Sequence, residues 1–205
     1  MSIDEVMRSA PVIPVLVLDG SLDPVGLAET LVEAGLPVIE VTMRTPAALA
    51  AIKAMAGVAG AIVGAGTVLN ERMLGEAIQA GAEFIVSPGL TEPLGRAAIA
   101  SGVSYLPGVA NAGDIMRGLD LGLSRFKFFP AEASGGLPAL SALAAVFGGV
   151  RFCPTGGIRE ATAPEWLAHP SVLCVGGSWL VQPGETDLAA IGDRARRAAE
   201  LRAAE

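Results

Sequence analysis

Short runs of β-branched and aromatic residues recur along the chain at a regular interval, and a helical stretch follows most of them. The interval is about 20 to 27 residues, which is typical of βα units that share one parallel sheet. Helical stretches such as DPVGLAETLVEAG and NERMLGEAIQAG begin with a capping residue and end at glycine. The strand candidates, roughly eight in number, are Val12–Val17, Val38–Met43, Ala61–Gly64, Glu83–Val86, Ser104–Leu106, Arg125–Phe129, Arg151–Cys153 and Val172–Val175.

These units predict a single domain over residues 1–205. No linker rich in Pro or Ser and no run of charge divides the 205 residues, a length that fits one domain with a sizeable core. Such units in one domain favour a compact (β/α)8 TIM barrel, and a doubly wound open sheet is the main alternative. In a barrel, inward polar side chains near the C-terminal ends of the strands would form the active site.

Charge and composition argue against several partners and locations. The formal net charge is −7 and lysine and arginine form no cluster, so nucleic acid is not expected as a partner. Residues 45–69 carry one charge, Lys53, but Pro46 and several glycines interrupt them, so no membrane span is expected. The short polar start and two scattered cysteines, Cys153 and Cys174, predict a cytoplasmic protein with buried free thiols.

Motifs for cofactors and metals are incomplete in this sequence. GAGTVLN, which starts at Gly64, has the first two glycines of a dinucleotide fingerprint, but Leu69 stands where the third belongs. In a barrel, Thr67 of this segment would instead face the substrate. His169 is the single histidine and precedes a proline at a predicted helix end, which suits a surface or capping role. We therefore expect no cofactor and no metal.

Lys127 is one of only two lysines, and it lies in the aromatic run RFKFFP. Burial of an ammonium group among apolar residues is costly, so two interpretations remain open. The side chain lies at an edge and reaches water, or it is desolvated and supplies a neutral amine as a nucleophile. Alternation places Arg125, Lys127 and Phe129 on one face, which is the inside of a closed barrel. A nearby Arg125 would further favour the neutral amine.

The run VIEVTMRT alternates between apolar and polar residues, with Glu40, Thr42 and Arg44 on one face. In a barrel this face points inward, whereas in an antiparallel sheet it would face solvent. Glu40 and Arg44 lie roughly 13 Å apart along an extended strand and would contact different parts of one ligand. A desolvated Glu40 suits proton transfer, and Arg44 suits binding of a carboxylate.

Glycine pairs follow the last two strand candidates, in PTGG at Pro154–Gly157 and in GGS at Gly176–Ser178. Glycine at a strand end lets backbone N–H groups approach an anion, although tight turns also require it. In (β/α)8 barrels, the loops after the seventh and eighth strands are the usual phosphate site. The two pairs, with the Thr155 and Ser178 hydroxyls, therefore predict a phosphate-binding site.

Several segments occur in one order between about Val12 and Leu180: IEVTMRT, IVGAGTVLN, FIVSPGLTEP, FKFFPAE, RFCPTGGI and VLCVGGSWL. In these segments the chain closely resembles the 2-keto-3-deoxy-6-phosphogluconate (KDPG) aldolases, which often also act on 4-hydroxy-2-oxoglutarate (KHG). The resemblance implies a homotrimeric, metal-free class I aldolase of the Entner–Doudoroff route. Such a lyase would cleave KDPG to pyruvate and glyceraldehyde 3-phosphate, and KHG to pyruvate and glyoxylate.

The resemblance also implies roles for individual residues. Lys127 would form the Schiff base, and Glu40 would be the general acid and base. The pocket around the keto-acid portion would consist of Arg44, Thr67, Pro88 and Phe129. The contacts on the phosphate side would come from Thr155, Gly156, Gly157, Gly177 and Ser178.

The segment PGVANAGDI departs from the family pattern, since many members carry Thr and Glu where this chain has Asn111 and Asp114. SGG at residues 134–136 replaces the NGG of some members, a milder change. Four other functions remain as alternatives. They are an aldolase for the galactonate epimer or mainly for KHG, a phosphosugar isomerase or epimerase on the same fold, a non-catalytic phosphate-binding module, and a nicotinamide-dependent oxidoreductase.

Overall fold

The computed structural model describes residues 1–182 and 184–201 of the chain. Its strands are β1 (Val12–Leu16), β2 (Val38–Thr42), β3 (Ile62–Gly66), β4 (Phe84–Val86), β5 (Ser104–Leu106), β6 (Gly108–Val109), β7 (Arg125–Phe128), β8 (Arg151–Pro154) and β9 (Val175–Gly177). Its helices are α1 (Ile3–Arg8), α2 (Pro24–Glu33), α3 (Ala48–Met55), α4 (Glu71–Gln79), α5 (Glu92–Ser101), α6 (Ala112–Asp120), α7 (Gly136–Val146), α8 (Ala163–Leu167) and α9 (Leu188–Ala199).

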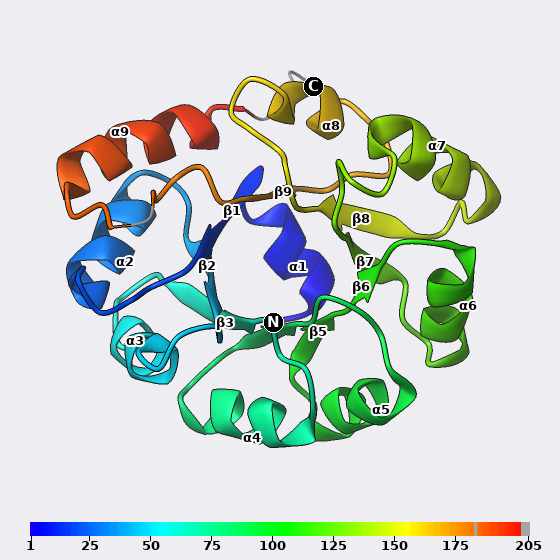
Figure 1. Cartoon of the computed structure of the whole chain (residues 1–205), viewed down its shortest axis with the longest axis horizontal. Helices are drawn as coiled ribbons and strands as arrows, with labels where there is room; N and C mark the ends of the chain where they lie inside the picture. Colours follow the sequence, from blue (N-terminus) through cyan, green and yellow to red (C-terminus); the bar gives the residue numbers. More distant parts are fainter. Residues whose placement is uncertain (183, 202–205) are drawn as a thin grey trace.

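The strands form a curled parallel sheet that helices cover from outside. Six strands pair in the order β5-β4-β3-β2-β1-β9, and three pair in the order β6-β7-β8. β5 and β6 are separated only by Pro107, and two isolated parallel bridges, Phe152 with Val172 and Thr155 with Gly176, join β8 to the segment of β9. Figure 1 shows the strands around one centre, α2 to α9 outside them, and α1 across the centre. The architecture is an α/β fold with a parallel sheet.

Seven of the expected strands are present with bounds that differ by two residues or fewer. The eighth was expected at Val172–Val175 but is displaced, because β9 pairs with β1 at Val175–Gly177 and Val172 makes only an isolated bridge. β3 continues through Gly66, beyond the expected end at Gly64. Two features lay outside the prediction: the short strand β6, which follows Pro107, and the helix α1.

The helix-capping predictions are confirmed for α2 and α4. The Asp23 carboxylate accepts from two backbone N–H groups at the start of α2, and the Asn70 amide oxygen accepts from Met73 N–H at the start of α4. Gly35 and Gly81 follow these helices with φ angles of +89° and +99°, a backbone conformation that favours glycine.

Two apolar clusters of different size lie on the two faces of the sheet. The larger one packs the outward side chains of the strands against the helices and includes Phe126, Phe128 and Phe152. The smaller one fills the interior and brings Val6 and Met7 of α1 together with inward side chains of several strands. Both cysteines belong to the smaller cluster as buried free thiols, which confirms that prediction.

Helix α1 covers the N-terminal ends of the strands. The Ser104 hydroxyl at the start of β5 donates to the Met1 carbonyl oxygen, and Arg125 Nε at the start of β7 lies 2.5 Å from Asp4 Oδ1. A capping box between Ser2 and Glu5 begins the helix. Within the described residues, none of the helices combines the length and apolar character that crossing a bilayer requires.

Candidate active site

Lys127 on β7 and Glu40 on β2 form a buried ion pair inside the curled sheet. Lys127 Nζ lies 3.0 Å from Glu40 Oε1 and 3.3 Å from Oε2. Only 7% of the lysine side chain and 4% of the glutamate side chain are exposed. Lys127 Nζ also lies 5.4 Å from the centroid of the Phe129 ring. The two residues that the sequence singled out separately are thus in direct contact.

Side chains alternate between the inner and outer faces of β2 and β7, and this alternation explains why Glu40 and Lys127 are in contact. Phe126 and Phe128 point outward into the larger apolar cluster, so the intervening Lys127 points inward. Glu40 alternates in the same way with Ile39 and Val41, which also belong to that cluster. Both polar side chains therefore point into the interior, which confirms the direction that the strand alternation predicted for Lys127 and Glu40.

Gly66 on β3 provides the space for the Glu40 carboxyl group. A Cβ atom at residue 66 would lie 2.2 Å from Glu40 Oε1 and 2.8 Å from its Cδ, far closer than atoms can approach. Gly66 pairs with Thr42 in the ladder of β2 and β3, so its backbone lies beside that of the glutamate strand. Glycine at this position is therefore required for the observed place of Glu40.

Arg125, which the sequence placed on the face of Lys127, is paired with Asp4 of α1. Its Nε lies 2.5 Å from Asp4 Oδ1, so the guanidinium charge is paired with α1 rather than unpaired beside the lysine. Arg8 contacts the same aspartate at 2.6 Å, and the Arg8 and Arg125 hydrogen bonds together lower the pKa of Asp4. The signal for this partner was absent from the sequence, because α1 is a short helix far from β7 along the chain.

Arg44 and Thr67 meet just beyond the ends of β2 and β3. Arg44 Nε donates to the Thr67 hydroxyl at 3.3 Å, and the guanidinium side chain is exposed. Thr67 has a φ of 59°, a left-handed conformation that is uncommon for a residue other than glycine. Such strain is often found at binding sites. The structure therefore brings together two residues that the sequence placed in one pocket.

Pro88 follows β4, and its carbonyl group passes close to β6. A Cβ atom at Gly108 would lie 2.2 Å from the Pro88 carbonyl oxygen, so glycine is needed where the two segments cross. Next to it, the Ser87 hydroxyl lies 2.7 Å from the Tyr105 hydroxyl, and burial raises the pKa of Tyr105 to about 12. This buried pair was missed because a serine before a proline and an isolated tyrosine carry no recognisable pattern.

The two glycine loops lie side by side at the ends of β8 and β9. Thr155 is buried and bridges Gly176, while Gly156 and Gly157 have φ angles of +103° and +83°. Gly177 ends β9, and Ser178 is exposed beyond it. Among the described residues, no acceptor bonds the backbone N–H of Gly157 or of Ser178. These donors are thus available to an anion.

A cavity of about 600 Å³ lies beside the glycine loop of β8 rather than at the buried lysine. Gly157, Arg159 and Trp166 line it together with Glu132 and Gly136. The buried pair of Lys127 and Glu40, and not this wide cavity, places an amine against a carboxylate.

The predictions for the remaining polar residues concern the ends of helices. His169 Nδ1 accepts from Ser171 N–H in the turn just after α8, and burial lowers the pKa of His169. Asn111 caps α6 by accepting from Asp114 N–H, and the Asp114 carboxylate accepts from Ala110 N–H. The departure from the family pattern thus preserves a helix cap. Within the described part of the chain, no group of three acidic, His or Cys side chains could hold a metal ion.

The fold and the site define an α/β enzyme with a buried lysine and a carboxylate inside its parallel sheet, the arrangement of an aldolase that works through an imine. The sequence model of the family described as "Aldolase: KDPG and KHG aldolase" matches residues 3–193. The chain belongs to the KDPG and KHG aldolase family.

Two relatives illustrate how close this membership is. The 2-dehydro-3-deoxy-phosphogluconate aldolase of Zymomonas mobilis is 60% identical over 202 residues, which cover 98% of this chain and 97% of the relative. Its crystal structure with 3-phosphoglycerate has a TM-score of 0.96 and covers 98% of this chain and 97% of that one. The KDPG aldolase of Legionella pneumophila, solved with pyruvate as a covalent carbinolamine intermediate, is 40% identical with a TM-score of 0.88, over 98% and 96% of the two chains.

Proposed function

We propose that this protein is a class I aldolase that cleaves KDPG to pyruvate and glyceraldehyde 3-phosphate, with Lys127 as the Schiff-base residue. The observation that carries the proposal is the buried pair in which Lys127 Nζ lies 3.0 Å from Glu40 Oε1. A carboxylate at this distance can take a proton from the ammonium group and leave a neutral amine for attack on a carbonyl. Family membership and the relatives described above support the same substrate.

The reaction begins when the neutral amine of Lys127 attacks the C2 carbonyl carbon of the keto acid. Glu40 returns the proton taken from the lysine to the departing hydroxyl group, and loss of water from the carbinolamine gives a protonated imine, which acts as an electron sink. Glu40 then removes the proton of the C4 hydroxyl through a water molecule. As that proton leaves, the C3–C4 bond breaks, its electron pair enters the imine system, and glyceraldehyde 3-phosphate departs as the aldehyde.

The second half of the reaction returns the lysine to its starting state. The enamine of pyruvate that remains on Lys127 takes a proton at C3 from Glu40. Water then adds to the imine carbon, and the C–N bond breaks to release pyruvate and the ammonium group of Lys127, which pairs again with the Glu40 carboxylate. The same sequence applied to KHG, the second compound in the family description, releases glyoxylate in place of the phosphorylated aldehyde.

The residues around the keto-acid portion have positions that suit this role. Arg44 and Thr67 are bonded to each other at the ends of β2 and β3, and the exposed guanidinium suits a substrate carboxylate. The Phe129 ring lies beside the amine, with its centroid 5.4 Å from Lys127 Nζ. Pro88 is a half-buried residue of the neighbouring loop after β4. We assign these four residues to the pocket of the keto acid.

We assign the phosphate to the two glycine loops, with Thr155, Gly156 and Gly157 on one side and Gly177 and Ser178 on the other. The support is the pair of N–H groups at Gly157 and Ser178 that meet no acceptor within the described residues. Backbone donors on adjacent loops can bind a phosphate without a lysine or arginine. Binding at both ends of the substrate would fix the C3–C4 bond over the amine.

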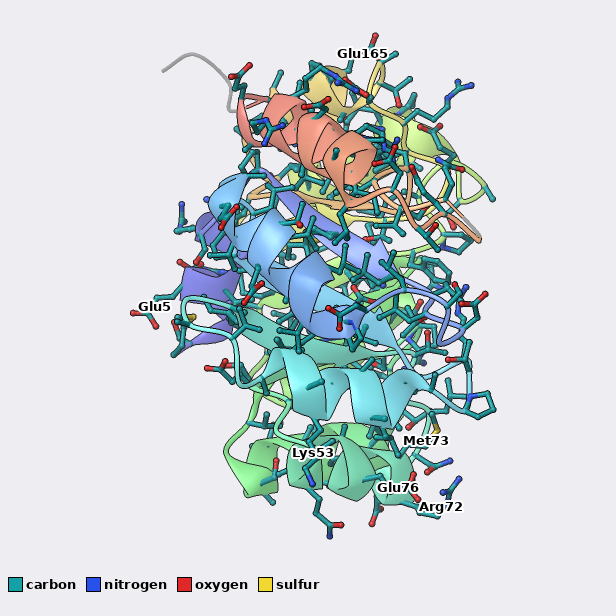
Figure 2. The ribbon with its side chains drawn as sticks, turned by 90° about the vertical axis from the view of Figure 1, so that its left-hand side faces the viewer. Glu5, Lys53, Arg72, Met73, Glu76 and Glu165 are labelled. Atoms are coloured by element: carbon teal, nitrogen blue, oxygen red, sulfur yellow. The ribbon has the colours of Figure 1, made fainter. Side chains whose placement is uncertain are left out.

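Borohydride reduction in the presence of pyruvate tests this proposal. A Schiff base on Lys127 predicts that the protein loses activity and gains a reduced adduct on the peptide with Lys127, which mass spectrometry identifies. Lys127→Met should form no adduct and lose cleavage activity. The matched control is Lys53→Met, which replaces the other lysine, a residue whose side chain extends from α3 into solvent (Figure 2), and should behave like the wild type. An unmodified Lys127 in the active protein would overturn the proposal.

We further propose that the sheet closes into a complete (β/α)8 barrel and that the enzyme is a cytoplasmic homotrimer. The bridges between β8 and β9, and the succession of β5 and β6 around Pro107, support closure of the sheet.

Apolar side chains exposed on α5, α6 and α7, among them Ile99, Met116 and Val146, support burial against further subunits. Buried free thiols agree with a reducing compartment. Light scattering would give the mass that decides the number of subunits.

A further inference from the structure

The loop after β7 is bonded to the glycine loop after β8 at two successive positions. Ala131 N–H donates to the Thr155 carbonyl oxygen at 2.8 Å, and Glu132 N–H donates to the Gly156 carbonyl oxygen at 3.1 Å. These bonds continue the pairing of β7 and β8 beyond the ends of both strands. The segment that follows Lys127 therefore shares its backbone geometry with the proposed phosphate loop.

The side chain of Glu132 adds a second connection, to α8. Its Oε1 accepts from Trp166 Nε1–H at 3.2 Å, and Trp166 is only 3% exposed, so this indole N–H depends on an acceptor from the protein. A Cβ atom at Gly157 would lie 2.7 Å from Glu132 Cγ and 2.8 Å from its Cβ. The aliphatic stem of Glu132 thus lies directly on the backbone of Gly157.

This contact restricts a pair of residues that are intrinsically flexible. Gly156 and Gly157 both have positive φ angles, and glycine populates several backbone regions with similar energy. The Gly157 N–H meets no acceptor within the described residues, and the backbone conformation of this pair sets the direction in which it donates. With the stem of Glu132 removed, the loop would lose a steric limit and its donor would be less well oriented.

We propose that Glu132 is a positioning residue that determines how well this enzyme holds the phosphate end of its substrate. The inference rests on the proposed function, because it needs the glycine loops to bind phosphate. Glu132 itself is not a phosphate ligand, since its negative charge would repel the phosphate and its Oε1 is bonded to Trp166. Its effect should be confined to the phosphate end, since the Lys127 and Glu40 side chains are bonded to each other whereas the Glu132 carboxylate is bonded to Trp166.

A purely stabilising role is the competing explanation. Glu132 Oε2 lies 3.6 Å from the position of a Cβ atom at Gly136, at the start of α7, where a negative charge favours the helix. Loss of that effect would lower the stability of the protein and change all steps alike. The two explanations make different predictions for a reaction that involves no phosphate. A stabilising role predicts that loss of Glu132 slows it, and a positioning role predicts that it does not.

The experiment compares two reactions of the same full-length variants. Cleavage of KDPG requires the phosphate loop. Exchange of the C3 protons of pyruvate with deuterium, followed by NMR, requires the Lys127–Glu40 pair and the keto-acid pocket but no phosphate site. Glu132→Ala should raise the KM for KDPG roughly ten-fold or more, because a misplaced binding group costs orientation. Its kcat and its rate of pyruvate exchange should remain within about two-fold of the wild type. Glu132→Gln keeps the stem and an oxygen acceptor for Trp166, and it should restore the KM.

Glu165→Ala is the matched control. Glu165 lines the same cavity and carries the same charge, but it is exposed and points away from the body of the molecule (Figure 2). Its removal should leave both reactions unchanged. Equal losses of KDPG cleavage and pyruvate exchange in Glu132→Ala, or an unchanged KM, would overturn the inference. Absence of both reactions in the wild type would instead overturn the proposed function, so the two failures are distinguishable.

Discussion

At the N-terminal ends of its strands the interior of the sheet is apolar and covered by α1, whereas further along the strands it holds a buried lysine and glutamate. Val6 and Met7 of α1 pack there against inward side chains such as Phe84. The ion pair at the covered end, Asp4 with Arg125, is partly exposed, and the pair in the interior is almost fully buried. Exposed pairs add little to stability, and buried pairs carry a large desolvation cost.

The difference shows how one strand can serve both stability and chemistry. Arg125 and Lys127 are two residues apart on β7, yet the first contacts a surface aspartate of α1 and the second contacts Glu40. A buried charged pair is a weak source of stability, so its presence is better explained by a function. We expect substitutions around the pair to act on turnover, and substitutions at the covered end to act on stability.

Gly66→Ala should give the largest effect and should act on turnover. The new methyl group would overlap the Glu40 carboxyl group, whose Oε1 lies 2.2 Å from that position, so Glu40 must leave Lys127. Loss of a positioned acid and base typically costs about 100-fold or more in kcat. Lys127 remains in place, so borohydride with pyruvate should still trap an adduct.

Gly75→Ala is the control for this substitution, because no atom lies within 4 Å of a Cβ atom at that position of α4. It should leave kcat unchanged. If Gly66→Ala retained kcat within about three-fold of the wild type, the geometric role assigned to this glycine would be wrong.

Met7→Ala should act on stability at the covered end. Met7 is fully buried in the interior cluster, and truncation of a buried methionine costs about 2 to 5 kcal/mol of the free energy of unfolding. Urea denaturation measures this loss. The kcat of the folded variant should stay close to that of the wild type, since Met7 lies at the end of the interior away from the proposed substrate loops.

The control is Val25→Ala on α2, where the residue is 38% exposed. Its effect on the free energy of unfolding should be within about 0.5 kcal/mol. A Met7→Ala variant that kept its stability but lost turnover would reverse the division of roles between the two ends.

The sequence indicated more about the interior that holds Glu40 and Lys127 than about the strand ends that α1 covers. The alternation in VIEVTMRT and RFKFFP predicted the inward direction of Glu40 and Lys127, because strand period is a local property. Their contact and the space left by Gly66 depend on strands that are distant along the chain, so they appear only in the fold. The displacement of β9 to Val175–Gly177 has the same origin, since pairing with β1 overrides the apolar run VLCV.

The cover that α1 provides at the N-terminal ends of the strands could not be predicted from the sequence, for a related reason. Helix α1 has six residues and its amphipathic pattern is too short to recognise. The partner of Arg125 could not be identified, because nothing in a local pattern connects β7 with Asp4. The link from Glu132 to Trp166 and Gly157 was missed likewise, although the resemblance to the family had marked the glycine.

Asp4→Asn should give the smallest effect, and its dependence on pH identifies the cause. The hydrogen bonds from Arg8 and Arg125 hold the pKa of Asp4 below its ordinary value of 3.8. A carboxyl group with a lowered pKa in the folded state stabilises the protein above its unfolded pKa, and that contribution is lost as the pH falls through the folded pKa. Because the pair is partly exposed and screened, the contribution should be no more than about 1 kcal/mol.

The free energy of unfolding, measured by urea at several pH values, tests this prediction. The difference between wild type and Asp4→Asn should be constant above about pH 5 and should shrink below about pH 4, where the wild-type carboxylate takes up its proton. Asp193→Asn removes an exposed pair with Arg196 on α9 and should show almost no difference at any pH. A difference for Asp4→Asn that persisted unchanged at low pH would mean that packing, and not the ion pair with Arg125, holds α1 against the strands.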